Sequence, residues 1–265
     1  MASTGQHLPN ESAVASMKIS IITVTYNSAA TIADTLHSVA SQSDAEIEHI
    51  VIDGASKDDT MAQVHRHGGH VQTLVSEPDH GIYDAMNKGI AAATGDIVGF
   101  LNADDRYAHP NVLATIQQMF GDAALDIVFG DVAFFHPAHP DQLIRRYRSD
   151  RFRPGLIGWG WMPAHPSMFV RRALFADAGS FKKNYRIAGD FEWVARTFQR
   201  PDLRYHYLPE VLVHMQTGGV STRGWRSTLL LNREVMQACR ENNIPTNWFK
   251  ILSKYPFKLL EYVRP

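Results

Sequence analysis

Ile97-Val98-Gly99-Phe100-Leu101-Asn102-Ala103-Asp104-Asp105 is the stretch that decides the fold of this chain. Its apolar half predicts a buried strand, and two adjacent carboxylates follow where that strand ends. Open α/β sheets bind their ligands at the carboxyl ends of strands. Carboxylate oxygens suit Mg²⁺ or Mn²⁺, which bridge them to substrate phosphates. The stretch therefore predicts a metal and phosphate site, with a turn or a helix cap as the alternative for the two aspartates.

The bulk properties narrow the class of protein. The chain has 265 residues, of which 45% are hydrophobic and 20% charged, as is usual for a globular protein that folds in water. A net charge of −1 creates no field that attracts nucleic acid, so we expect no nucleic-acid partner. The single Cys239 excludes an intramolecular disulfide and fits a reducing, cytoplasmic compartment. No apolar run is as long as a transmembrane helix, and residues 1–16 lack the pattern of a signal peptide. We expect residues 1–16 to be a disordered lead-in.

Strands and helices alternate along the first hundred residues. Hydrophobic patterns predict strands at 18–25, 48–53, 71–75 and 97–101, with helices at 29–41, 58–67 and 82–93 between them. Such alternation is typical of βαβ units and a mostly parallel sheet.

The regular alternation of strands and helices ends in the second half of the chain. Patterns predict strands at 127–135, 167–170 and 212–215, and helices at 112–120, 171–178, 191–199 and 225–240. Residues 136–165 show no clear period, and we interpret them as functional loops.

Four motifs occur in a fixed order at residues 21–27, 53–60, 81–89 and 102–105. With this spacing the chain resembles family 2 glycosyltransferases, the large inverting group with the GT-A fold, over about residues 17–215. Within that family it looks most like bacterial polysaccharide-assembly enzymes. The resemblance implies an α/β GT-A fold, in which helices flank a single Rossmann-like, mostly parallel central sheet. The implied boundaries are a lead-in (1–16), a GT-A domain (17–222) and a C-terminal helical extension (223–265).

The resemblance also implies an activity. The enzyme would use Mg²⁺ or Mn²⁺ to move a sugar from a nucleotide-sugar donor, expected to be UDP-linked, to a hydroxyl of a glycan or a polyprenyl-diphosphate-linked acceptor. The pathway would be cell-surface polysaccharide biosynthesis. Two alternatives stay open: a sugar nucleotidyltransferase and a non-catalytic module that binds nucleotide sugars. The first would normally carry a Gly-rich basic loop after the first strand, which this chain lacks.

The resemblance assigns the donor pocket to three of the motifs. Asp53 matches the acidic residue that contacts the uracil or ribose, and its alternative is an Asx-turn before Gly54. The backbone around Tyr26 would line the same pocket, although Asn27 could simply start the helix. The donor-binding residues implied in full are Thr25, Tyr26, Asn27, Asp53, Asp84, Asn87, Lys88, Asn102 and Asp104. Lys88 would meet a phosphate, or would be an ordinary solvated lysine.

Asp104 and Asp105 match the metal motif of the family, whose usual form is Asp-x-Asp. Asn102 stands at the first position here, which leaves open which aspartate binds the metal and which contacts the ribose or sugar. His214 is a further candidate for the metal or the diphosphate, with a structural histidine at a strand end as the alternative. Residues 221–223 would close over the diphosphate.

The catalytic base must take a proton from the acceptor hydroxyl, because inverting transfer is a direct displacement. Asp190 matches the acidic motif of the family, and a helix N-cap is its alternative role. Glu192 is the substitute candidate. On the acceptor side we also expect His165, Trp159 and Trp161; the two tryptophans could stack on sugar rings or belong to the core.

Aromatic and basic residues alternate in the last segment, 247–264. Such segments can lie on a membrane surface, so we expect peripheral contact with the inner face of the cell membrane; packing against the domain is the alternative.

Overall fold

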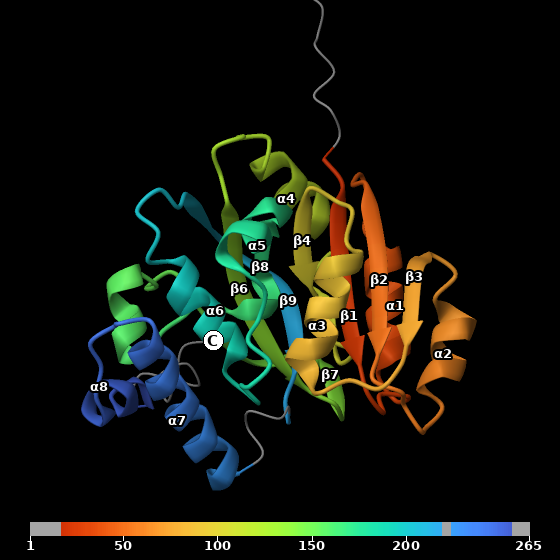
Figure 1. Cartoon of the computed structure of the whole chain (residues 1–265). Coiled ribbons are helices and arrows are strands. Elements are labelled where there is room, and N and C mark those ends of the chain that lie inside the picture. Colours follow the sequence, from red (N-terminus) through yellow and green to blue (C-terminus); the bar gives the residue numbers. More distant parts are fainter. Residues whose placement is uncertain (1–16, 219–223, 256–265) are drawn as a thin grey trace, which may run out of the picture.

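The computed structural model describes residues 17–218 and 224–255. In these residues a nine-stranded sheet is flanked by helices (Figure 1). The sheet order is β3-β2-β1-β4-β8-β6-β9-β5, and β7 pairs with β6. The predicted α/β architecture with a mostly parallel sheet is confirmed, because only β5, β7 and β8 run against the direction of the other strands.

The first half of the sheet is built from βαβ units. Its elements are β1 (Ile19–Thr25), α1 (Ile32–Ala40), β2 (Ile47–Asp53), α2 (Thr60–His67), β3 (Val71–Ser76), α3 (Ile82–Ala92) and β4 (Ile97–Phe100). In the parallel register Thr25 lies beside Asp53 and Asp53 beside Ser76. The carboxyl ends of these strands therefore meet at one edge of the sheet, as predicted for a ligand site.

The second half mixes strand directions. Its elements are β5 (Asp105–Tyr107), α4 (Val112–Met119), β6 (Ile127–His136), β7 (His139–Tyr147), the 3₁₀ helices η1 (Pro154–Trp159) and η2 (His165–Ser167), β8 (Met168–Arg171), α5 (Arg172–Ala178), α6 (Gly189–Thr197), β9 (Tyr205–Gln216), α7 (Trp225–Glu241) and α8 (Trp248–Leu252). The interpretation of residues 136–165 as loops was wrong in part, because β7 forms a hairpin with β6.

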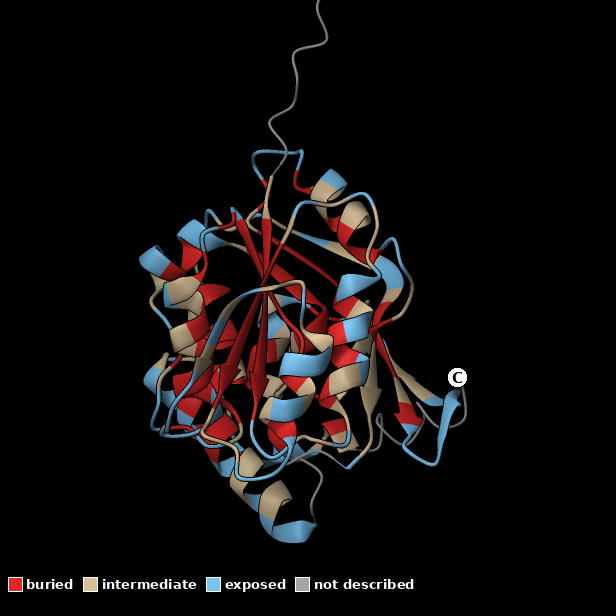
Figure 2. Ribbon diagram, turned by 90° about the vertical axis from the view of Figure 1, so that its right-hand side faces the viewer, coloured by how far each residue is buried: buried red, intermediate tan, exposed pale blue. Residues whose placement is uncertain are grey.

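Alternate residues of β1 face two separate cores. Ile22 and Val24 pack with α3, α5 and α6 on one face of the sheet, whereas Ile19 and Ile21 pack with α4 on the other. Figure 2 shows the buried sheet between helices whose outer faces are exposed. Burial on both faces explains why β1 and β4 show no alternation of apolar and charged residues: β1 is a β-branched run and β4 an apolar run.

The C-terminal helices share the core of the domain. Val235, Ala238 and Cys239 of α7 and Ile251 of α8 are fully or almost fully buried in the cluster that contains α6. Through residue 255 the predicted extension is thus packed against the domain. None of the described helices has the length and apolarity that crossing a bilayer requires. The lead-in predicted for residues 1–16, the loop at 221–223 and the end of the C-terminal segment (256–264) lie outside the described residues.

Candidate active site

Two loops at the carboxyl ends of β1 and β2 are joined by hydrogen bonds. Asn27 adopts a left-handed conformation (φ 51°), and its backbone N–H donates to Ser56 Oγ at 2.8 Å. The Lys57 N–H donates to Asn27 Oδ1 at 2.8 Å. The Asn27 side chain therefore joins the loops, while the neighbouring Tyr26 ring is 58% exposed. Thr25 contributes a buried hydroxyl that has no hydrogen-bond partner among the described residues.

Asp53 forms the turn that the sequence left open as an alternative. Its buried carboxylate accepts hydrogen bonds from Ser56 N (3.0 Å), from Ser76 Oγ (2.6 Å) and from the Ser56 hydroxyl. These bonds fix the loop at residues 54–57 against β3. In this conformation the carboxylate orders the wall of the expected nucleotide pocket, and its direct contact with uracil or ribose stays a prediction.

The aspartate pair lies where β4 ends and β5 begins. Asp105 is only 2% exposed, and both of its side-chain hydrogen bonds are long: 3.4 Å from Gln216 N to Oδ1 and 3.4 Å from Asn102 Nδ2 to Oδ2. Burial, and then the charge of Asp104, raise the pKa of Asp105 well above its usual value. A buried carboxylate beside a second one, with weak donors, is poorly stabilised unless a cation is present.

Asn102 adds a third oxygen to this site. Its buried Oδ1 accepts no hydrogen bond from any described residue. The side chains of Asn102, Asp104 and Asp105 therefore fit Mg²⁺ or Mn²⁺, which are bound by one or two carboxylates together with substrate phosphates. No group of three or more His, Cys, Asp or Glu side chains that could hold a metal occurs in residues 17–218 and 224–255, so the protein alone does not form a closed metal cage there.

His214 lies on the strand β9 that pairs with β5, and its predicted metal contact stays a prediction. In the antiparallel pair of β5 and β9, Asp105 lies opposite Met215, and Arg106 lies opposite His214. Successive side chains on a strand point to opposite faces, so His214 and Asp105 lie on different faces of this ladder. Burial, followed by the nearby charges of Arg106 and His109, lowers the pKa of His214.

Asp190 lies in the first turn of α6, with one side-chain oxygen held and the other open. Its Oδ1 accepts hydrogen bonds from Phe191 N (2.8 Å) and from the Tyr83 hydroxyl (3.1 Å). No group among the described residues donates to Oδ2. The N-cap of α6 is Ala188, and the helix has no side-chain cap, so the capping role considered for Asp190 was wrong.

His165 connects Asp190 to the end of β4. Its ring stacks on Phe100, the last residue of β4, with the ring centroids 5.2 Å apart. Burial lowers the pKa of His165, and the charge of Asp190 opposes this shift, so the two side chains are close enough to interact. Tyr83, in the first turn of α3 after β3, donates to Asp190, so Asp190 lies toward the carboxyl ends of the strands, where the aspartate pair also follows β4.

The α3 residues assigned to the donor hold neighbouring segments instead. Asn87 uses both amide atoms on Phe181, donating to its carbonyl oxygen (2.8 Å) and accepting from its N–H (2.9 Å). The Lys88 ammonium pairs with Glu77 (2.8 Å) and donates to the Pro78 carbonyl. These polar atoms are engaged within the protein, and the donor roles of Asn87 and Lys88 stay predictions.

The third α3 residue, Asp84, is also engaged. Its carboxylate accepts from His80 N (3.1 Å) and pairs with Lys183 (3.2 Å). Its predicted contact with the donor stays a prediction, because Lys183 is exposed and can move away.

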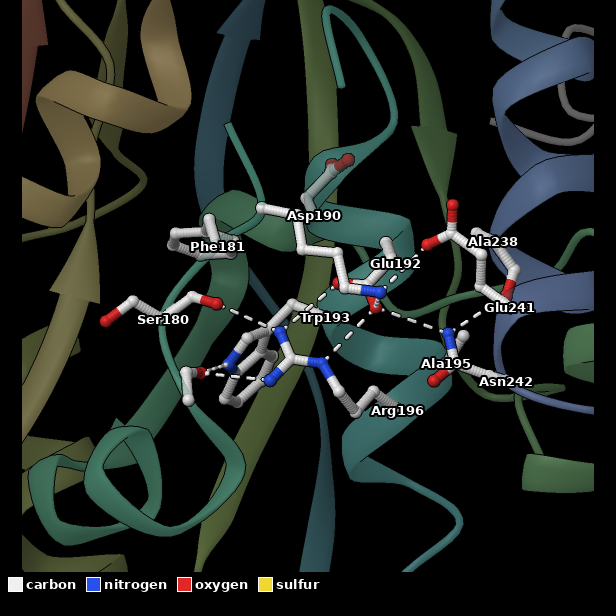
Figure 3. A network of polar contacts seen from close by, with 12 residues as sticks. Ser180, Phe181, Asp190, Glu192, Trp193, Ala195, Arg196, Ala238, Glu241 and Asn242 are labelled. Carbon is white, nitrogen blue, oxygen red and sulfur yellow. Dashed lines mark hydrogen bonds and ion pairs between the residues drawn. The ribbon is translucent and has the colours of Figure 1, made fainter. Parts of the chain in front are cut away.

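Glu192 lies in a network that faces away from Asp190 (Figure 3). Its fully buried carboxylate pairs with Lys182 at 2.9 Å and with Arg196 at 3.2 Å. Asn242, the C-cap residue of α7, donates to the same carboxylate. A carboxylate held between two cations is a poor base, so these contacts favour Asp190 as the base, and the substitute role of Glu192 stays a prediction.

Trp159 lies apart from the acidic residues. It lines a cavity of about 290 Å³ between η1, the end of α6 and α8, and the Lys250 ammonium lies 5.5 Å from the centroid of its ring. None of the residues that line this cavity carries a carboxylate. Trp161 follows η1 and is half-buried. The acceptor contacts of Trp161 and His165 stay predictions, and Trp159 packs against the C-terminal segment.

Sequence reasoning missed two residues of this region, Tyr83 and Glu234. Tyr83 falls inside the third motif, but its contact with Asp190 spans 107 residues. Glu234 is a charged residue on the buried face of the amphipathic α7, between Leu231, Val235 and Ala238. That position in the pattern was the available signal, since a buried charge requires partners.

Comparisons with known proteins agree with this geometry. Residues 20–177 match the model of "Glycosyl transferase family 2". A relative from Mycobacterium bovis, a "PGL/p-HBAD biosynthesis glycosyltransferase", is 31% identical over 224 residues, which cover 78% of this chain and 80% of the relative.

Two solved structures show the same fold. Staphylococcus aureus TarS (residues 1–349, in complex with UDP-GlcNAc) has a TM-score of 0.66 at 19% identity, covering 84% of this chain and 66% of TarS 1–349. The mannosyltransferase PcManGT from Pyrobaculum calidifontis, in complex with GDP-Man and Mn²⁺, has a TM-score of 0.62 at 22% identity, covering 84% and 63%. The chain spans only 39% of the longer TarS structure. On the family match and the M. bovis relative, the chain belongs to glycosyl transferase family 2, a family of enzymes that transfer sugars.

Proposed function

We propose that this enzyme is a metal-dependent inverting glycosyltransferase. The donor is a UDP-linked nucleotide sugar, and the acceptor is a hydroxyl of a glycan or of a polyprenyl-diphosphate-linked sugar. The product belongs to cell-surface polysaccharide biosynthesis, and the enzyme works in the cytoplasm.

The observation that carries the proposal is the pairing of two unlike acidic sites at one sheet edge. Asp105 is buried, weakly hydrogen-bonded and beside Asp104, whereas Asp190 is partly exposed and has an open Oδ2. The first environment suits a carboxylate that pairs with a cation, and the second suits one that accepts a proton. Inverting transfer requires both functions on opposite sides of the sugar.

In the proposed reaction Asp190 acts as the general base. The acceptor hydroxyl donates to Asp190 Oδ2 and transfers its proton there while its oxygen attacks the anomeric carbon. The bond from that carbon to the diphosphate oxygen breaks, and the nucleoside diphosphate leaves. Tyr83 holds Oδ1 throughout, because burial, and then the charge of Asp190, raise the pKa of its phenol and keep the phenol protonated.

Asn102, Asp104 and Asp105 would hold Mg²⁺ or Mn²⁺. When bound, the cation supplies Lewis-acid stabilisation of the leaving diphosphate. The chain itself contributes the oriented oxygens of these three side chains and the loops at residues 25–28 and 53–57, which form the walls of the nucleotide pocket.

A donor screen tests this function. The wild-type enzyme is incubated with a panel of nucleotide sugars and glycan acceptors, with Mg²⁺, with Mn²⁺ or with EDTA. We expect transfer that EDTA abolishes and either cation restores, and a product with inverted anomeric configuration. Retained configuration, or full activity in EDTA, contradicts the mechanism. Release of pyrophosphate from a nucleoside triphosphate supports a sugar nucleotidyltransferase instead, and metal-dependent UDP binding without any turnover supports a binding module.

Peripheral membrane contact is a separate part of the proposal. In α8 the side chains of Phe249 and Trp248 are 77% and 43% exposed next to Lys250, and Trp225 at the start of α7 is 72% exposed beside Arg226. Exposed aromatics next to cations bind anionic interfaces. The enzyme should sediment with phosphatidylglycerol vesicles but not with phosphatidylcholine vesicles, and Phe249→Ser should weaken this binding. Binding to neither kind of vesicle contradicts membrane contact, and equal binding to both contradicts recognition of an anionic interface.

A further inference from the structure

We infer that Glu234, on the C-terminal helix α7, is a positioning residue for the catalytic base. The inference rests on the proposed role of Asp190. Through Glu234, α7 would help to position the base of the active site, although α7 lies outside the segment that matches the family model.

Glu234 accepts hydrogen bonds from the backbone immediately before α6, the helix that carries Asp190. Its Oε1 accepts from Arg186 N at 2.9 Å, and its Oε2 accepts from Ile187 N at 2.9 Å and from Ala188 N at 2.8 Å. The residue is only 7% exposed. Three N–H groups on one buried carboxylate form charge-assisted bonds, which are shorter and stronger than neutral ones.

The bound segment leads directly into the base. Ala188 is the N-cap of α6, and Asp190 is two residues further along the chain. The Ile187 carbonyl accepts a hydrogen bond from the Tyr83 hydroxyl (2.6 Å), the same hydroxyl that donates to Asp190 Oδ1. Glu234 thus holds the N–H groups of this segment, while Tyr83 holds a carbonyl of the segment and the carboxylate of the base.

The packing around Asp190 leaves little room for the backbone of residues 186–189 to move. A Cβ on Gly189 would lie 2.7 Å from the Tyr83 ring, so this turn already packs at the closest possible distance. Movement of residues 186–188 would therefore be transmitted to Asp190 rather than absorbed by a gap.

A second carboxylate of α7 contacts the same loop before α6, but it pairs with a side chain and not with the backbone near Asp190. Glu241 pairs with Lys182 at 2.8 Å, and Lys182 also pairs with Glu192 (Figure 3). Glu241 therefore offers a matched control, because it lies on the same helix, carries the same charge and contacts the same loop through a side chain.

The three hydrogen bonds from the backbone of residues 186–188 to Glu234, called the clamp below, predict a loss of kcat without a loss of donor affinity. A base displaced by about 1 Å loses roughly a hundredfold in rate while the donor still binds. Glu234→Gln keeps the shape and one accepting oxygen, so kcat should fall by about tenfold, and Glu234→Ala should lower it by about a hundredfold. The affinity for UDP and the KM for the donor should stay within about twofold in both variants, because Asp190 contacts the acceptor.

The experiment is a double-mutant cycle on the full-length enzyme. Glu234→Gln, Glu241→Gln, Asp190→Asn and the double variant Glu234→Gln/Asp190→Asn are compared for kcat, donor KM, UDP affinity and melting temperature. If Glu234 acts through Asp190, Glu234→Gln lowers kcat in the wild type but not in the Asp190→Asn background, and Glu241→Gln leaves kcat near the wild-type value.

The outcomes separate the inference from the proposed function. Equal losses of kcat in Glu234→Gln and Glu241→Gln, or full additivity with Asp190→Asn, overturn the positioning role even if Asp190 is the base. Wild-type kcat in Asp190→Asn overturns the proposed base itself. A readout that needs no substrate is hydrogen exchange of the amides of residues 186–188: it should accelerate in Glu234→Gln and not in Glu241→Gln, and unchanged exchange contradicts the clamp.

Discussion

The Tyr83 hydroxyl donates to Asp190 Oδ1 at 3.1 Å and joins α3, from the first half of the chain, to α6. The same hydroxyl donates to the Ile187 carbonyl at 2.6 Å. One buried phenol therefore orients the proposed base and fixes the segment that precedes it. Because these contacts leave Asp190 Oδ2 open, they define which oxygen can take the proton of the acceptor.

Removing that hydroxyl tests its role. Tyr83→Phe keeps the ring that packs against Gly189 but leaves Asp190 without its cross-helix donor. Loss of such a hydrogen bond costs about 1–3 kcal/mol, so kcat should fall by roughly five- to a hundredfold while UDP affinity is retained. Tyr205→Phe, at the opposite end of the sheet, is the control and should keep wild-type kcat. Unchanged kcat in Tyr83→Phe would show that the phenol does not orient the base.

The close packing at Gly189 predicts that a larger residue there lowers stability and activity. The Cβ of Gly189→Ala would lie 2.7 Å from the Tyr83 ring, so the ring or α6 must shift. Such overpacking typically costs about 1–3 kcal/mol of stability. We expect a lower melting temperature and a loss of transfer in this variant. Gly155→Ala is the matched control, because a Cβ there meets nothing within 4 Å. Equal melting temperatures and rates for the two variants would contradict the close packing at α6.

Asp53 predicts how the nucleotide pocket is ordered. Asp53→Ala removes the acceptor of three hydrogen bonds from Ser56 and Ser76, so the loop at residues 54–57 should loosen. UDP affinity should fall by roughly ten- to a hundredfold, the equivalent of about 1–3 kcal/mol. Ser76→Ala removes one of these bonds but keeps the carboxylate, and it should cost less. Calorimetric titration with UDP measures both variants, and wild-type affinity in Asp53→Ala would remove Asp53 from the account of the pocket.

The lowered pKa of Glu48 predicts how the free energy of unfolding depends on pH. Burial alone would raise the pKa of Glu48, but hydrogen bonds from Ser20 and Thr94 and the charge of Lys18 together lower it from 4.5 to about 2. The folded protein keeps this carboxylate ionised where the unfolded chain binds a proton. The stabilisation, about 3 kcal/mol at most, is thus complete above pH 4.5 and lost as the pH falls toward 2.

Urea unfolding between pH 7 and pH 2.5 measures this effect. Glu48→Gln should be less stable than the wild type at pH 7, and the difference should shrink as the pH falls. Glu210→Gln, on the exposed part of β9, should parallel the wild type. A constant difference between Glu48→Gln and the wild type across the pH range would show that Glu48 acts through packing alone.

The βαβ half of the fold could be predicted from the sequence because its signals are local. β1 and β4 are buried on both faces and appear as a β-branched and an apolar run, and the aspartate pair follows soon after β4. The hairpin strand β7 gave no such signal, since its first six residues are exposed and polar positions dominate it. β9 was predicted only at 212–215, because its earlier part contains Pro209 and few buried residues.

The roles of side chains were harder to predict than the strands. Asn87 and Lys88 lie in a motif of the family, yet their partners are Phe181, Glu77 and Pro78, and only the folded chain shows them. For His214 the sequence could not show the register, and one residue of register decides which face of a strand a side chain occupies. Glu192 lies two residues from Asp190 on the same helix, but it faces the cations Lys182 and Arg196.

The central claim is that Asp190 is the base of an inverting sugar transfer, and its most direct test is the rate of transfer by Asp190→Asn at saturating donor and acceptor. Asp177→Asn, on the exposed side of α5, is the control for loss of a carboxylate. General-base catalysis contributes about 10²–10⁴ in rate, so Asp190→Asn should retain at most about 1% of wild-type kcat, with UDP affinity and melting temperature unchanged. A kcat within threefold of the wild type in Asp190→Asn would contradict the claim.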